Sequence, residues 1–138
     1  MATYVKFQQF VEDVAHGVHD LETDQLVVFL TNTAPTVATD AVIADITEIS
    51  YTNLSSRNIT TTSSAHTTGT YKLTLTDLVL TASGSVGPFR YVGVYNDTPA
   101  TPLDPLIQYY DYGSAVTMAN GETFTVDFDG TNGFLTIA

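Results

Sequence analysis

Apolar residues recur at spacings of three and four near the start of the chain. This period predicts an amphipathic helix over residues 1–22. The apolar stripe consists of Phe7, Phe10, Val11, Val14, Val18 and Leu21. Charged residues such as Glu12 and Asp13 fall largely on the opposite face. Gly17 weakens a helix by about 1 kcal/mol relative to alanine, so we expect it to mark either the helix end or a close packing contact.

From residue 25 onward the pattern changes to short runs rich in β-forming residues. These runs cover residues 25–31, 71–80, 89–95, 106–112, 123–128 and 134–137. The continuous apolar run at 25–31 predicts a strand that is buried on both faces. Phe124, Val126 and Phe128 alternate with polar residues, so they share one face of a strand. The pattern at 42–49 fits a short strand and an irregular segment equally well.

Seven or eight short strands separated by turn signals favour an antiparallel β-sandwich or a jelly-roll-like barrel. The predicted fold class is therefore mainly β, with one N-terminal amphipathic helix. We find no internal repeat or linker, so we expect residues 1–138 to form a single domain: the helix at 1–22 and a β domain at 23–138. Residues 50–69 are polar and rich in Ser, Thr and Asn, which predicts a long loop or an edge strand that contacts a partner.

The charge balance excludes several classes of partner. The chain has fifteen Asp and Glu against four Lys and Arg, a formal net charge of −11. A nucleic-acid-binding protein needs a basic surface, and so does one that binds an anionic membrane; we therefore expect neither partner. No apolar run reaches the length of about 18–20 residues that spans a bilayer. The N-terminal residues lack the pattern of a signal peptide, so we expect the protein to stay in the cytoplasm until it joins an assembly.

The sequence contains no catalytic motif that we can identify. The nucleophile elbow, the zinc-protease helix and the phosphate-binding loop are all missing, and there is no cysteine. His16 and His19 lie near Asp13 and Asp20 in the sequence, a spacing that could hold a divalent cation. Such a spacing often arises by chance, so we favour exposed polar residues or an interaction with the helix end over a metal site. Residues 127–133 favour a β-hairpin turn over a calcium loop. We expect no enzyme activity, no cofactor and no bound metal.

Three tyrosines gather in the run at residues 106–112. Tyr110 and Tyr112 share one face of the predicted strand, and Tyr109 lies on the other. One face could be a protein interface, where tyrosine is enriched, but a buried core on one side with solvent on the other fits equally well. Arg57 and Asn58, in the polar segment, are the other candidate interface residues.

Nine segments, spread over most of the chain, carry a resemblance to a known group. They are residues 10–21, 30–35, 45–49, 69–73, 87–92, 95–98, 104–107, 111–113 and 120–124. In this order they resemble a group of short virion structural proteins of tailed bacteriophages. Residues 50–65 depart from the Gly-rich segment of that group.

The resemblance implies a decoration or cement protein on the outer capsid surface. Such a protein would assemble in the host cytoplasm, bind the phage major capsid protein, and form a homo-oligomer, with a trimer favoured. The resemblance also leaves a tail-associated alternative: a host-recognition module, a tail-tube protein or a head–tail joining protein. For host recognition, the tyrosines at 109–112 are the expected contact.

Overall fold

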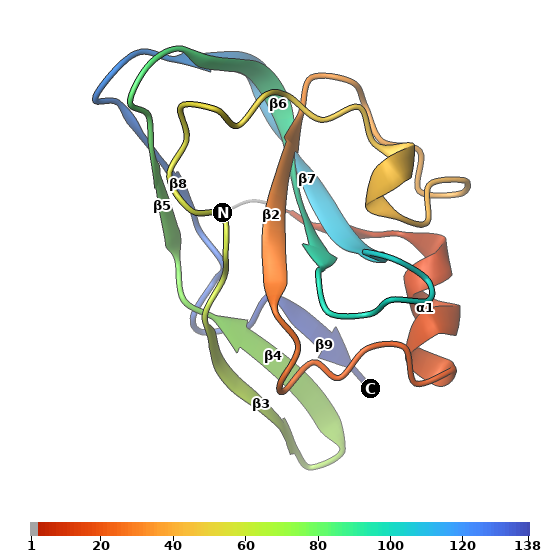
Figure 1. Ribbon diagram of the computed structural model, residues 1–138. Helices are drawn as coiled ribbons and strands as arrows, with labels where there is room; N and C mark the ends of the chain where they lie inside the picture. The colour runs from red at the N-terminus through yellow and green to blue at the C-terminus, as the bar shows by residue number, and fades with distance from the viewer. Residues whose placement is uncertain (1–2) are drawn as a thin grey trace.

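A computed structural model describes residues 3–138 and shows antiparallel sheets with one α-helix near the N-terminus (Figure 1). The elements in chain order are β1 (Val5–Lys6), α1 (Gln8–Ala15), β2 (Leu26–Thr31), the 3-10 turn η1 (Ile43–Asp45), β3 (Thr61–Thr67), β4 (Thr70–Leu75), β5 (Leu78–Thr81), β6 (Val86–Asn96), β7 (Leu106–Met118), β8 (Thr123–Val126) and β9 (Leu135–Ile137). The predicted mainly β class is confirmed, and the arrangement is compatible with a β-sandwich.

Within residues 3–138 the strands form three sheets. The four-stranded sheet has the order β1-β7-β6-β2, the three-stranded sheet β3-β4-β9, and the two-stranded sheet β5-β8. In Figure 1 the two smaller sheets lie along one side and the lower end of the four-stranded sheet. The larger core cluster joins residues of all three sheets, including Val94, Leu73 and Phe124. Apolar burial between the large sheet and the two small sheets is therefore what holds the layers together.

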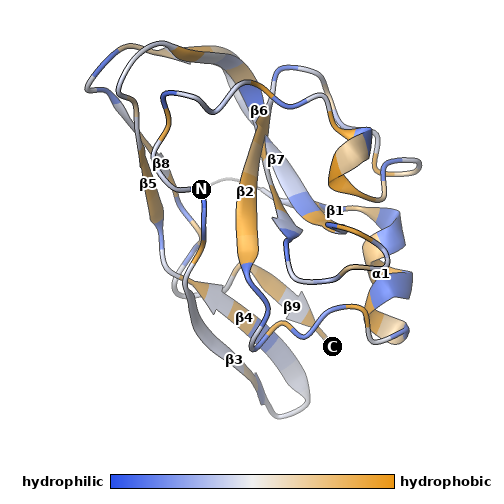
Figure 2. Cartoon of the chain, in the orientation of Figure 1, coloured by the Kyte–Doolittle hydropathy of each residue, from blue (hydrophilic) through white to orange (hydrophobic). Residues whose placement is uncertain are grey.

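Strand β2 is buried along its whole length, as its apolar run predicts. One face contributes Val28 and Leu30 to the larger core. The other face contributes Val27 and Phe29 to a second cluster, which also contains Phe7. Figure 2 shows β2 as one of the most hydrophobic strands of the chain. Both faces are thus covered: the larger core packs on one face, and Phe7 and Ile46, which lie just before α1 and just after η1, belong to the cluster on the other.

Helix α1 is much shorter than the helix predicted for residues 1–22, of which residues 1 and 2 lie outside the described residues. It ends at Ala15, and Gly17, two residues later, has a φ of 72°. The N–H of Gly17 donates to the Val14 carbonyl at 3.2 Å, and the N–H of Val18 donates to the Asp13 carbonyl at 2.9 Å. This pair of bonds is a Schellman motif, so Gly17 stops the helix. The prediction that Asp13 lies on the polar face of the helix is wrong, because Asp13 is buried. Val11, predicted to lie in the apolar stripe, is instead 61% exposed.

The polar segment at 50–69 contains an edge strand, one of the two forms expected for it. Strand β3 pairs with β4 through the tight turn Thr68–Gly69, where φ is 52° and 82°. Two positive φ values in a two-residue loop are typical of a type I′ hairpin. In Figure 1 this hairpin projects at the lower end of the molecule.

Two strands and one turn differ from the sequence prediction. The run at 71–80 is divided between β4 and β5, which belong to different sheets. Strand β7 does not end at Gly113 but bends there, with a φ of 98°, and continues to Met118. The turn at 129–133 is not a hairpin, since β8 pairs with β5 and β9 pairs with β4.

Among the described residues, no helix has the length and apolar character needed to cross a membrane.

Candidate interaction site

The predicted tyrosines line a groove at one edge of the four-stranded sheet. We call it the tyrosine groove; its lining residues are Thr3, Val5, Tyr109, Tyr110, Asp111, Tyr112, Thr125 and Asp127. Its volume is about 700 Å³. Strand β1 pairs with β7 only at Val5–Tyr109 and Lys6–Gln108, so β7 extends well beyond its short neighbour. The groove lies where β1, β7 and β8 come together.

The three tyrosines take the faces that strand alternation predicts. Tyr110 is 5% exposed and packs edge-on against Tyr4, with ring centroids 5.0 Å apart. Tyr112, on the same face, is 50% exposed and contacts Phe124 at 5.1 Å. Tyr109 packs on the other face against Phe7 at 5.5 Å. Only Tyr112 of the two same-face rings therefore presents a large surface to a partner.

Tyr110 and Asp111 each have one protonation state near neutral pH. Burial, with smaller effects from Tyr112 and Asp127, raises the pKa of Tyr110 to about 12, so its hydroxyl stays protonated. Hydrogen bonds, chiefly from Arg90, lower the pKa of Asp111, so this carboxylate stays ionised. Arg90 binds Asp111 through two contacts, Nε–Oδ1 at 2.8 Å and an Nη–Oδ2 contact at 3.0 Å. The groove thus combines aromatic surface with a positioned hydrogen-bond acceptor, which suits binding.

Arg57 and Asn58 are not brought together with the tyrosines. They lie beside β2, at the opposite edge of the four-stranded sheet. Arg57 donates to the Val28 carbonyl at 2.7 Å and lies 3.6 Å from the centre of the Tyr51 ring. These contacts use the guanidinium to attach the 50–60 loop to β2. Asn58 is exposed and bridges to Val27.

A polar cluster around the buried Asn96 lies near the end of α1, and no local sequence pattern predicted it. Asn96 is fully buried; its Nδ2 donates to Asp24 Oδ2 at 2.7 Å and lies 3.1 Å from His19 Nδ1. His16, by contrast, is exposed and lies 3.7 Å from Glu12. The two histidines therefore do not face a common point. Among residues 3–138 we find no cluster of three metal-binding side chains.

Acid is expected to destabilise the protein through His19. Burial lowers the pKa of His19 and outweighs the opposite effects of Asp13 and Asp24. An unfolded histidine binds a proton near pH 6.5, whereas folded His19 does so only at lower pH. Protons therefore favour the unfolded state, and His19 contributes a loss of stability as pH falls below about 6.5.

Thermal unfolding at pH 7.5 and 5.5 measures this effect. The His19→Gln variant should lose less stability between these two pH values than the wild type. The His16→Gln variant is the matched control and should behave like the wild type, because His16 is exposed. Equal losses in the wild type and in His19→Gln would contradict the prediction.

Comparison of the chain with protein-family models, curated proteins and solved structures gave no match.

Proposed function

We propose that this chain is a non-enzymatic phage virion protein that binds the outer capsid surface and stabilises the head. The tyrosine groove is the structural observation that carries the proposal, and the resemblance of nine sequence segments supplies the partner, the major capsid protein. Tyrosine is enriched at the centres of protein interfaces, and its truncation often causes a large loss of affinity. The tyrosines of the groove lie on β7 of the four-stranded sheet, so their rings are held in place before binding.

Val5 and Tyr112 give the groove an exposed apolar rim, at 46% and 50% exposure. A capsid segment seated in the groove would cover both side chains. Binding would then add buried interface between the bound protein and the shell, and disassembly would have to break it. The strongly acidic body would remain in contact with solvent.

Co-sedimentation of the purified protein with separated heads and tails, prepared from particles that lack it, tests the proposal. We expect saturable binding to heads at many copies. Tyr112→Ala should weaken head binding about tenfold or more, because it removes an exposed aromatic ring that the bound capsid segment would cover. Val79→Ala is the matched control, since Val79 on β5 is 53% exposed and lies outside the groove. Binding to neither particle, or binding that Tyr112→Ala leaves unchanged, would overturn the proposal.

A second function is favoured by the carboxylates beside the rings. Asp111 and Asp127 line the same groove as the tyrosines. Aromatic faces together with carboxylate acceptors suit a sugar, so a tail-borne module that recognises a host glycan is the alternative. Binding to tails alone in the same experiment would exclude the capsid site, and loss of host adsorption in Tyr110→Ala particles that remain intact would then support glycan recognition.

A further inference from the structure

Strand β3 is an open edge in a projecting hairpin. It lies at the end of the order β3-β4-β9 and runs for seven residues, Thr61–Thr67. Most of the hairpin near its turn is exposed, including Ala65, His66 and Thr67. An edge strand presents backbone N–H and C=O groups that can pair with another strand.

This edge lacks most of the features that usually prevent such pairing. Proteins commonly protect an edge with lysine, proline, an inward charge or a covering element. Residues 61–67 contain neither lysine nor proline, and His66 is their one titratable side chain. Their pairing with β4 shows a single irregularity, between Thr61 and Ser63, at the base of the hairpin. The stretch from Ser63 to Thr67 is regular and open.

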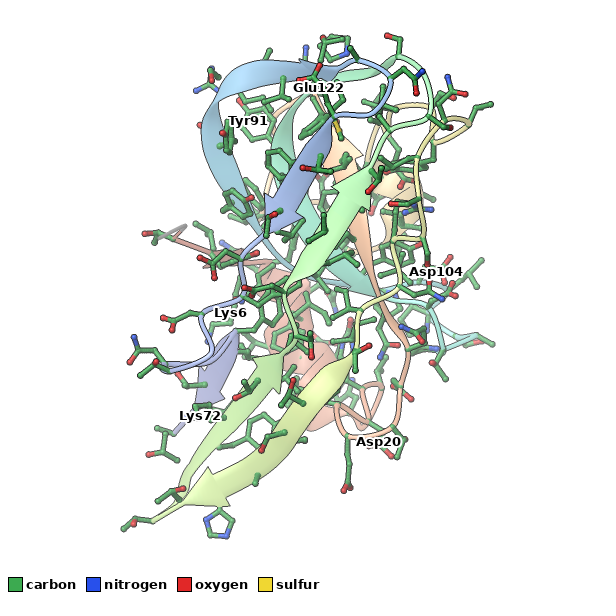
Figure 3. All side chains as sticks on the ribbon, turned by 90° about the vertical axis from the view of Figure 1, so that its left-hand side faces the viewer. Lys6, Asp20, Lys72, Tyr91, Asp104 and Glu122 are labelled. Atoms are coloured by element: carbon green, nitrogen blue, oxygen red, sulfur yellow. The ribbon has the colours of Figure 1, made fainter. Side chains whose placement is uncertain are left out.

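The charge distribution also favours contact here. All fifteen acidic residues lie outside residues 49–76, which carry Arg57, His66 and Lys72. Two copies with a net charge of −11 repel each other, and the repulsion is least where neither copy presents a carboxylate. Asp20 and Glu22 line the same shallow hollow as Ser64, and Figure 3 shows Asp20 at the base of the hairpin. Contact is therefore most favourable toward the turn.

The hairpin geometry determines which backbone groups are free. In a two-residue hairpin the residues that flank the loop, here Thr67 and Thr70, form a hydrogen-bonded pair. Alternate residues then turn their backbone groups away from the partner strand, which places those of Ser64 and His66 on the open side of β3.

We propose that two copies of this chain pair through β3 in antiparallel fashion, forming one continuous sheet across a two-fold axis. Ser64 of each copy pairs with His66 of the other, so that both open residues exchange backbone hydrogen bonds. Ala65 then faces Ala65 of the second copy in a close, non-hydrogen-bonded pair that its small side chain accommodates. The resemblance favours a trimer, whereas this pairing gives a dimer.

Sedimentation of the purified full chain over a range of concentrations tests the pairing without any phage particle. We expect a monomer–dimer equilibrium that shifts toward dimer as salt increases, because salt screens repulsion between the two acidic bodies. Ala65→Glu and Ala65→Lys should each weaken dimerisation about fivefold, since like charges directly opposite each other destabilise a strand pair. An equimolar mixture of the two variants should restore the dimer, which also shows that both are folded.

Thr136→Glu is the matched control, because it adds the same charge at an exposed position on β9, the other edge of this sheet. It should dimerise like the wild type. A chain that stays monomeric at every concentration overturns the proposal. So does a dimer that Thr136→Glu weakens and Ala65→Glu leaves intact, which would place the contact at β9. Loss of capsid binding with an intact dimer would count against the proposed function alone.

Discussion

Replacing Gly93 by alanine is expected to lower the free energy of unfolding by about 1–3 kcal/mol, the usual range for overpacking a core. Gly93 lies in β6 directly opposite Phe29 of β2, and a Cβ at this position would overlap the Phe29 ring. Phe29 is fully buried in the second core cluster, so the ring has little room to move aside. Valine at position 93 should destabilise the protein more than alanine.

Urea denaturation of four chains separates this steric effect from other effects of losing a glycine. Phe29→Ala alone should lower the free energy of unfolding by about 3–5 kcal/mol, because it leaves a cavity. Gly93→Ala should have a smaller effect when Phe29 is already alanine, so the double mutant should be more stable than the sum predicts. Gly130→Ala is the control, as no atom lies within 4 Å of the Cβ it would add. Additive losses from Gly93→Ala and Phe29→Ala would contradict the steric explanation.

Replacing Asn96 by alanine is expected to lower the free energy of unfolding by about 1.5–3 kcal/mol, the range for a lost hydrogen bond to a charged group. Asn96 connects separate parts of the chain. Its Nδ2 donates to Asp24 at 2.7 Å, and its Oδ1 accepts from the N–H of Thr98 at 3.1 Å. Alanine removes both bonds, and no other side chain in this cluster replaces them.

Asn96→Asp distinguishes hydrogen bonding from packing. It keeps the shape of the side chain but replaces the donor to Asp24 with a second acceptor, so it should be at least as destabilising as Asn96→Ala near neutral pH. Asn32→Ala is the control, because Asn32 is exposed. Urea midpoints for the three variants provide the measurement. An Asn96→Asp chain as stable as the wild type would show that the bond to Asp24 contributes little.

Local patterns predicted the elements better than their ends. The apolar run at 25–31 and the alternation of Phe124 and Val126 identified real strands, because these patterns reflect burial within one element. The end of α1 depends on the conformation of Gly17, for which the sequence offered two interpretations. The division of 71–80 into β4 and β5 depends on which sheet each half joins, and pairing between distant strands leaves no local period.

The candidate site was only partly predicted, because local patterns do not show which elements pack against each other. Strand alternation placed Tyr110 and Tyr112 on one face, but it could not say that Tyr110 forms the buried floor and Tyr112 the exposed rim. Arg57 was expected at an interface because it lies in the polar segment at 50–69, yet its contacts attach a loop to β2. Asn96 was missed because an asparagine after a strand is also typical of an exposed turn.

The strand order has a consequence for how the chain reaches its native state. Val5 pairs with Tyr109 and Leu73 pairs with Leu135, so strands near both ends of the chain join partners far away in sequence. Local pairing is available only at hairpins such as β3–β4. Domains dominated by such distant pairings fold in milliseconds to seconds, because long loops must close before the contacts form. During synthesis, the four-stranded sheet stays incomplete until β7 has left the ribosome, and β4 lacks its second neighbour until β9 has followed.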